Sequence, residues 1–184
     1  MNRKKSIDKE FLRRLATHEG GHTVSIWASP CACLVDRVSI RRSRNGRAYT
    51  HRLQKNLPRT ISEIIDAIAI NLAGMAAEKL LGYEQSVGAA SDLASATRMV
   101  KKMVLELGMG KRTGVRVFDE NEPVSGWLRS DIDRDIRDIL EQARQLAKRR
   151  LIKHRVKLDA VIELLLERQT LGAKALEEVL GPKA

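Results

Sequence analysis

Apolar side chains recur every three or four residues through most of the chain, which is the spacing of an amphipathic helix. The first such run predicts a helix over residues 8–28, and Pro30 is expected to mark its end. A second run follows Thr60 and Glu63, whose spacing is that of a capping box, and it continues to Gly82. The first half of the chain is therefore expected to be built around two amphipathic helices.

The second half of the chain shows the same helical spacing. A helix over residues 93–107 is expected to end at Gly108, where glycine can adopt the left-handed cap conformation. After an irregular stretch, Ser130 and Asp133 predict the start of a further helix, which runs to a charged break near Lys153. Two shorter helices complete the chain, at residues 158–166 and 173–180.

One region has the pattern of strands instead. Residues 35–42 and 47–53 are rich in strand-forming side chains, and Asn45-Gly46 stands between them. Asn-Gly between two such runs is the strongest short signal for a β-hairpin. The predicted fold class is therefore mainly α (α+β), with one β-hairpin and a C-terminal helical bundle.

Length, charge and cysteine usage narrow the class of protein. With 184 residues, 43% of them hydrophobic, the chain is expected to form a single domain over residues 1–184. No segment reaches the ~20 apolar residues that a membrane span needs, and the N-terminus has no apolar signal core. Cys31 and Cys33 are too close for an ordinary structural disulfide, so we expect a cytoplasmic protein.

The first predicted helix carries the clearest chemical motif, His18-Glu19-Gly20-Gly21-His22. Residues i and i+4 share one face of a helix, so two imidazoles at this spacing can ligate one Zn²⁺ ion. The glutamate between them is then placed to act as general base toward a zinc-activated water. A catalytic zinc site usually has three protein ligands, and the spacing alone does not say where the third lies.

The chain resembles the zinc peptidase domain of the FtsH family of AAA+ proteases, and the resemblance covers nearly its whole length. Besides the histidine motif, it rests on three stretches in the same order as in that family. They are Leu72-Ala73-Gly74-Met75-Ala76-Ala77-Glu78, then Gly88-Ala89-Ala90-Ser91-Asp92-Leu93 with Ala96-Thr97, and the predicted tail helices through Leu158-Asp159-Ala160 and Thr170-Leu171.

The resemblance implies a zincin-type fold and a set of site residues. It makes Asp92 the third zinc ligand beside His18 and His22, Glu19 the general base, and Glu78 a residue that orients a ligand imidazole. The alternatives are that Asp92 is a charge favoured at a helix N-terminus and that Glu78 is a solvated helix residue. Tyr49, Thr50 and Tyr83 are open candidates for stabilising an oxyanion.

The resemblance also implies a function and partners. We expect a zinc-dependent metalloendopeptidase that cleaves peptides or unfolded proteins. The chain has no phosphate-binding loop of the Walker type and no membrane anchor, so a separate AAA+ ATPase acting in trans is one expected partner. The family's peptidase domains form hexameric rings, which makes a homo-oligomer a further expectation.

A rival interpretation starts from charge. The formal net charge is +11, and residues 36–59 and 144–157 each carry a local excess of seven positive charges. Such segments favour a catalytically silent scaffold or a nucleic-acid-binding regulator on a peptidase fold. Aromatic residues make up only 3% of the chain and no nucleic-acid motif is present, which argues against nucleic acid as a partner.

Overall fold

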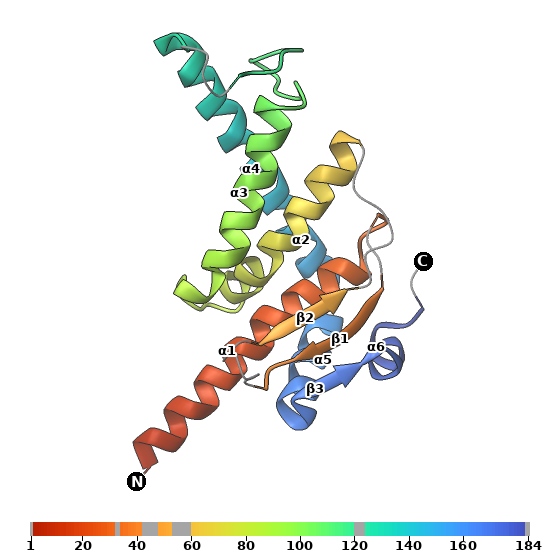
Figure 1. Cartoon of the computed structure of the whole chain (residues 1–184). Helices are drawn as coiled ribbons and strands as arrows, with labels where there is room; N and C mark the ends of the chain where they lie inside the picture. Colours follow the sequence, from red (N-terminus) through yellow and green to blue (C-terminus); the bar gives the residue numbers. More distant parts are fainter. Residues whose placement is uncertain (1, 32–33, 42–47, 53–59, 120–123, 183–184) are drawn as a thin grey trace.

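The computed structural model describes residues 2–31, 34–41, 48–52, 60–119 and 124–182. Within these residues the chain is mainly helical with a small sheet, as predicted (Figure 1). In chain order the elements are α1 (Asn2–Trp27), β1 (Val35–Ser39), β2 (Tyr49–Arg52), α2 (Ile61–Leu80), η1 (Val87–Ala89), α3 (Ala90–Leu105), α4 (Gly126–Lys153), α5 (Arg155–Arg168), β3 (Thr170–Gly172) and α6 (Ala173–Leu180).

The local signals at the helix ends are largely confirmed. Thr60 caps α2 through its side chain, and the Glu63 side chain bonds back to the Thr60 backbone, which completes the capping box. Gly108 follows α3 with a φ of 59°, the left-handed conformation expected of it. The break expected near Lys153 separates α4 from α5.

The predicted start of α4 is wrong by one turn. The helix begins at Gly126 rather than at Ser130, and Ser125 precedes it without a side-chain capping bond. Leu128 is 8% exposed and extends the apolar stripe of Ile132 and Ile136 by one turn. Burial of this stripe therefore decides where the helix begins, and the capping chemistry of Ser130 and Asp133 is not used.

Thr170 and Leu171 lie between the two predicted tail helices, where no strand was expected, and they form the strand β3. Gln169 adopts a left-handed conformation with a φ of 59°, which ends α5. The chain then pairs antiparallel with β1, so that Leu171 lies opposite Val38 and is only 1% exposed. Such a short strand has no periodicity of its own and depends on a partner far away in the sequence.

The predicted hairpin strands are present as β1 and β2. They pair antiparallel, with Val38 opposite Thr50, and the strand order in the sheet is β2-β1-β3. The predicted turn at Asn45-Gly46 and residues 42, 47 and 53 of the predicted strands lie outside the described residues. Within the described part of the chain β2 is an edge strand.

Helix α1 packs against α2 on one side and α5 on the other, and the contact with α2 is very close. A Cβ atom added at Gly21 would lie 2.5 Å from the carbonyl oxygen of Ala73 and 2.6 Å from Cβ of Ala77. Glycine at this position therefore lets the two backbones approach.

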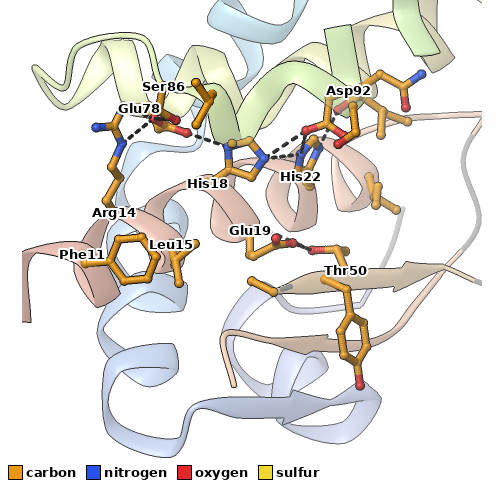
Figure 2. Close-up of a pocket in the computed structure, with 18 residues that line it drawn as sticks. Phe11, Arg14, Leu15, His18, Glu19, His22, Thr50, Glu78, Ser86 and Asp92 are labelled. Atoms are coloured by element: carbon orange, nitrogen blue, oxygen red, sulfur yellow. Dashed lines mark hydrogen bonds and ion pairs between the residues drawn. The ribbon is translucent and has the colours of Figure 1, made fainter. Parts of the chain in front are cut away.

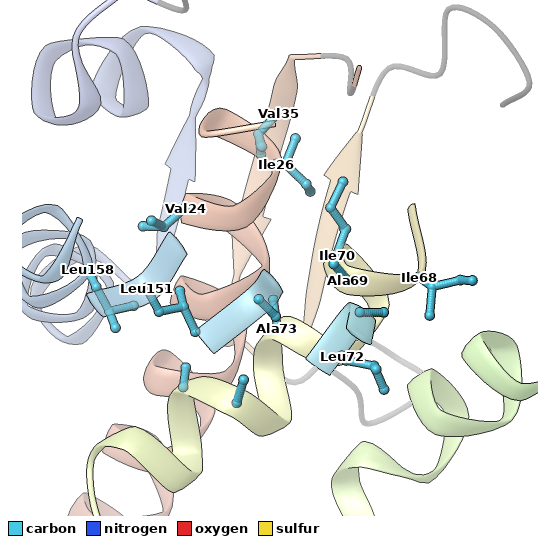
Figure 3. Close-up of a cluster of buried hydrophobic side chains, with 14 of the residues drawn as sticks. Val24, Ile26, Val35, Ile68, Ala69, Ile70, Leu72, Ala73, Leu151 and Leu158 are labelled. Carbon is cyan, nitrogen blue, oxygen red and sulfur yellow. The ribbon is translucent and has the colours of Figure 1, made fainter. Parts of the chain in front are cut away.

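Apolar side chains of α1, α4 and α5 fill the space on the other side of this crossing (Figure 3). Val24, Leu151 and Leu158 have no exposed surface. This packing fixes α1 between α2 and α5, and with it the orientation of the face that bears the histidines. Among the described residues, the structure contains no helix that is both long and apolar enough to cross a membrane.

Candidate metal centre and active site

Three side chains from two helices meet at one point. His18 and His22 lie on successive turns of α1, and Asp92 lies in the first turn of α3. The Asp92 Oδ2 atom is 3.0 Å from Nε2 of His18 and 3.2 Å from Nε2 of His22, and the two Nε2 atoms are 3.2 Å apart (Figure 2). The structure thus brings together the residues proposed as ligands although 70 residues separate His22 from Asp92.

Nδ1 of each histidine, the ring nitrogen that faces away from Asp92, has its own hydrogen-bond partner. Nδ1 of His22 donates to the carbonyl oxygen of Ile70 at 2.8 Å, because a carbonyl can only accept. Nδ1 of His18 lies 2.6 Å from Oε1 of Glu78, which is 4% exposed and therefore not a solvated helix residue. These contacts aim both Nε2 atoms at Asp92 and fix the tautomer that a metal ligand needs.

Gly74 gives the imidazoles the space that they occupy. A Cβ atom at this position of α2 would lie 2.6 Å from Cε1 of His18 and 2.6 Å from Nε2 of His22. No side chain fits there without displacing both rings. The sequence shows Gly74 as part of a glycine-containing stretch, but its role becomes visible only when α2 lies against α1.

Glu19 lies in the same cleft as the histidines but on the side of the sheet. Its side chain accepts a hydrogen bond from Oγ1 of Thr50, on β2, at 2.7 Å. The cleft has a volume of about 690 Å³, and its lining includes all three ligand candidates, Glu19 and Thr50. Glu19, which is 6% exposed, is therefore held in the cleft beside the proposed metal position (Figure 2).

The charges of the side chains in this cluster favour the binding of a cation. Burial lowers the pKa of His18, but hydrogen bonds with Asp92 and Glu78 raise it to about 9. Burial raises the pKa of Asp92, but hydrogen bonds with His18 and His22 hold it well below its usual range. Burial likewise raises the pKa of Glu78, and its bonds with His18 and Arg14 lower it further than burial raises it. Both carboxylates are thus ionised beside the imidazoles.

The donor set fits zinc. Two imidazole nitrogens and one carboxylate oxygen are typical ligands of a catalytic zinc ion, and bonds of ~2.0–2.2 Å in a tetrahedron place ligand atoms ~3.3–3.6 Å apart. The observed separations of 3.0 to 3.2 Å are slightly shorter, so the three atoms need to move apart only by a few tenths of an ångström to hold the ion. Because both Nδ1 atoms already have hydrogen-bond partners, both Nε2 atoms face Asp92, and a cation bound there would replace the protons that now lie between them.

The remaining candidates from the sequence are placed differently. Tyr49 and Thr50 line the cleft, whereas Tyr83 is not among its lining residues and its ring lies 5.7 Å from the guanidinium of Arg14. Sequence reasoning did not identify Arg14 as a site residue. The arginine donates to Glu78 at 2.8 Å, so its role depends on a contact across 64 residues.

Besides this geometry, the sequence matches the model of a known peptidase family. The model of peptidase family M41 matches residues 5–179, which is nearly the whole chain. The chain belongs to peptidase family M41. The matched region contains α1, α2 and α3 and therefore every residue of the cluster.

Curated relatives of this M41 chain are named ATP-dependent zinc metalloprotease FtsH. The protein of Rhodococcus erythropolis is 36% identical over 195 residues, which cover 97% of this chain and 23% of the relative. The protein of Pseudothermotoga lettingae is 34% identical over 187 residues, 91% of this chain and 29% of the relative. The chain thus spans about a quarter of the length of these relatives.

Proposed function

We propose that this chain is a zinc-dependent metalloendopeptidase that hydrolyses peptide bonds of peptides or unfolded proteins. One observation carries the proposal: the nitrogens of His18 and His22 and an oxygen of Asp92 converge in an open cleft that also holds Glu19. Membership of family M41 and the names of the relatives support the same activity. In this assignment His18, His22 and Asp92 hold the metal.

The proposed mechanism divides the chemistry between the metal and the protein. Zinc, when bound, would act as a Lewis acid toward the attacking water and the carbonyl of the scissile bond. The Glu19 carboxylate accepts the proton that the water loses and delivers it to the nitrogen of the leaving amine. Thr50 donates to Oε2 of Glu19, which leaves Oε1 without a hydrogen bond among the described residues. This free oxygen is the one we assign to proton transfer.

The edge strand β2 suggests how substrate is held. Tyr49 and Thr50 of β2 line the cleft, so an extended peptide pairing with this strand would pass beside Glu19. Backbone pairing requires an extended segment, which a folded substrate does not offer. We therefore propose peptides and unfolded chains as substrates.

The proposal also covers the extent of the domain and the partners with which it acts. Buried side chains from α1 to α6 form one hydrophobic cluster, which supports a single metallopeptidase domain over residues 1–184. The relatives are named ATP-dependent, so we infer that an AAA+ ATPase unfolds folded proteins and delivers them to this site as extended chains. A hexameric ring and a cytoplasmic location stay predictions.

The rival nucleic-acid role receives little support from the C-terminal basic segment. Three of its seven cations form ion pairs with acids: Arg144 with Glu141, Arg150 with Asp66, and Arg155 with Asp159. These contacts neutralise part of the local positive charge. The segment is therefore less suited to a phosphate backbone than its sequence suggests.

The proposal is tested by cleavage of a fluorophore-quenched unfolded protein in the presence of zinc, comparing wild type with Glu19→Gln. The substitution preserves shape and removes the proton acceptor, so we expect turnover to fall about 10²- to 10⁴-fold while bound zinc stays at one per chain. Glu10→Gln is the matched control, because Glu10 is an exposed residue of the same helix.

Either of two results would contradict the proposal. One is a Glu19→Gln chain that cleaves as fast as the Glu10→Gln control. The other is a wild-type chain that binds zinc and cleaves nothing, which would show a metal site without peptidase activity of its own.

A further inference from the structure

Behind the proposed metal centre, the Arg14 side chain connects the elements that carry it. Nε of Arg14 donates to Oε2 of Glu78 at 2.8 Å, and Nη2 lies 2.7 Å from the same oxygen. The other oxygen of Glu78 is the one that contacts Nδ1 of His18. A chain of contacts thus runs from Arg14 through Glu78 to an imidazole whose far nitrogen faces Asp92 (Figure 2).

The same guanidinium also holds the segment that leads to Asp92. Its Nη2 donates to the carbonyl oxygen of Glu84, and its carbon lies 5.7 Å from the ring centre of Tyr83. This segment reverses the chain after α2 and leads through η1 into α3, where Asp92 lies in the first turn. Ser86 of the segment donates to the Arg14-bound oxygen of Glu78 at 3.3 Å.

We propose that Arg14 is a positioning residue of the metal centre. It fixes the Glu78 carboxylate against His18 and fixes the 83–86 segment that sets the position of Asp92, so two of three metal ligands depend on one side chain. The inference rests on the proposed function, because it takes His18, His22 and Asp92 as zinc ligands. Its consequence is that zinc affinity depends on a residue that does not touch the metal.

The neighbouring arginine provides a matched control. Arg13 lies on the same helix and also forms an ion pair, with Glu163 of α5, but 49% of its side chain is exposed. Such exposed pairs contribute little. The Arg14 side chain is 28% exposed and its partner Glu78 only 5%. Removing either arginine takes one positive charge from α1, but only one of them contacts the support of the metal site.

The test measures zinc affinity by competition with a fluorescent chelator. We expect Arg14→Met to weaken zinc binding about 10- to 100-fold, which is the usual effect of removing a residue that supports a metal ligand through hydrogen bonds. Arg13→Met should change zinc binding less than about twofold. Cleavage by Arg14→Met should recover at saturating zinc, because the proton acceptor is untouched. Arg14→Lys keeps the charge but not the forked contacts, and should fall between wild type and Arg14→Met.

A double-mutant cycle with Glu78→Gln tests whether Arg14 acts through Glu78. We expect the loss caused by Arg14→Met to be several-fold smaller in the Glu78→Gln background than in wild type. If Arg14→Met does not fold, Arg14→Lys is used for the cycle.

The inference is overturned if the Arg14 variants bind zinc as tightly as Arg13→Met, or if the two losses in the cycle are fully additive. A wild-type chain that does not bind zinc would overturn the proposed function and this inference with it. Weaker zinc binding in the Arg14 variants of a zinc-binding wild type supports this inference and the assignment of His18, His22 and Asp92 as ligands, whereas the peptidase activity is tested by the Glu19→Gln comparison.

Discussion

Glu78 and Asp135 are both buried carboxylates with an arginine beside them, but they serve different parts of the molecule. Glu78 is 4% exposed and bonds to side chains, those of His18 and Arg14. Asp135 is 1% exposed and accepts from the backbone N–H groups of Arg112 and Thr113 at 2.9 Å each, through Oδ2. It also accepts from the Arg112 guanidinium.

The difference lies in what each carboxylate holds in place. Asp135 closes the connection between α3 and α4, which lies at the opposite end of α3 from Asp92 (Figure 1). Its hydrogen bonds pair the backbone N–H groups of Arg112 and Thr113 in the turn that follows α3. Glu78 instead orients an imidazole toward an open cleft. Loss of Asp135 should therefore reduce stability, whereas loss of Glu78 should reduce zinc affinity.

Asp135→Ala is expected to have the largest effect. It leaves two N–H groups, a hydroxyl and a guanidinium without their shared acceptor, so we expect the free energy of unfolding to fall by about 3 kcal/mol. Zinc affinity of the folded chain should not change. Asp138→Ala is the control: Asp138 pairs with the same Arg112 but its side chain is 60% exposed, so its loss should cost less than ~1 kcal/mol. Urea unfolding measures both; equal losses would contradict this view of Asp135.

Gly74→Ala should affect the metal centre most strongly. The added Cβ would lie 2.6 Å from atoms of both His18 and His22, and we expect zinc affinity to fall about 100-fold or more. Gly20→Ala is the matched change within α1, where the added Cβ meets nothing closer than 3.3 Å. Chelator competition that shows similar affinities for the two variants would mean that the imidazoles do not need the space beside Gly74.

Glu78→Gln should have a smaller effect on the same quantity. The amide keeps the shape but supports the His18 imidazole less strongly than a carboxylate, so we expect zinc affinity to fall about tenfold. The midpoint of urea unfolding, measured with a chelator present, should move less than for Asp135→Ala. The comparison between the two carboxylates fails if Glu78→Gln destabilises the fold more than it weakens zinc binding.

The pH dependence of the free energy of unfolding tests whether the charge of Asp135, and not only its shape, stabilises the fold. Burial raises its pKa, but hydrogen bonds from Thr113 and Arg112 outweigh burial and lower it. A lowered pKa stabilises the fold above the unfolded value of ~3.9, and this contribution is lost as the pH falls through the folded value. The gap in unfolding free energy between wild type and Asp135→Asn, in chelator, should therefore be full at neutral pH and narrow below pH ~4. A gap that widens in acid would give the opposite sign.

Much of the fold follows from local sequence signals. The capping box at Thr60 and Glu63 fixes the start of α2, and the left-handed glycine at Gly108 follows α3 as predicted. The start of α4 and the strand β3 were missed because burial of Leu128 and pairing of Leu171 with Val38 depend on distant parts of the chain. Local chemistry cannot report such contacts.

The residues of the candidate site also fall into two groups, those that the sequence predicts and those that only the folded structure shows. His18, Glu19 and His22 are evident from their spacing on one helix, which fixes their geometry. Asp92 and Glu78 came from the resemblance to a family, and the structure places both against His18. Arg14, Gly74 and the bond from Thr50 to Glu19 involve contacts between separate elements. No spacing in the sequence indicates them.

The most direct test of the central assignment is anomalous diffraction at the zinc edge from crystals of the zinc-loaded chain. The account predicts one strong peak per chain, within ~2.0–2.2 Å of Nε2 of His18, Nε2 of His22 and a carboxylate oxygen of Asp92. A zinc-loaded crystal with no peak at this position, or with its zinc bound by other residues, would contradict it.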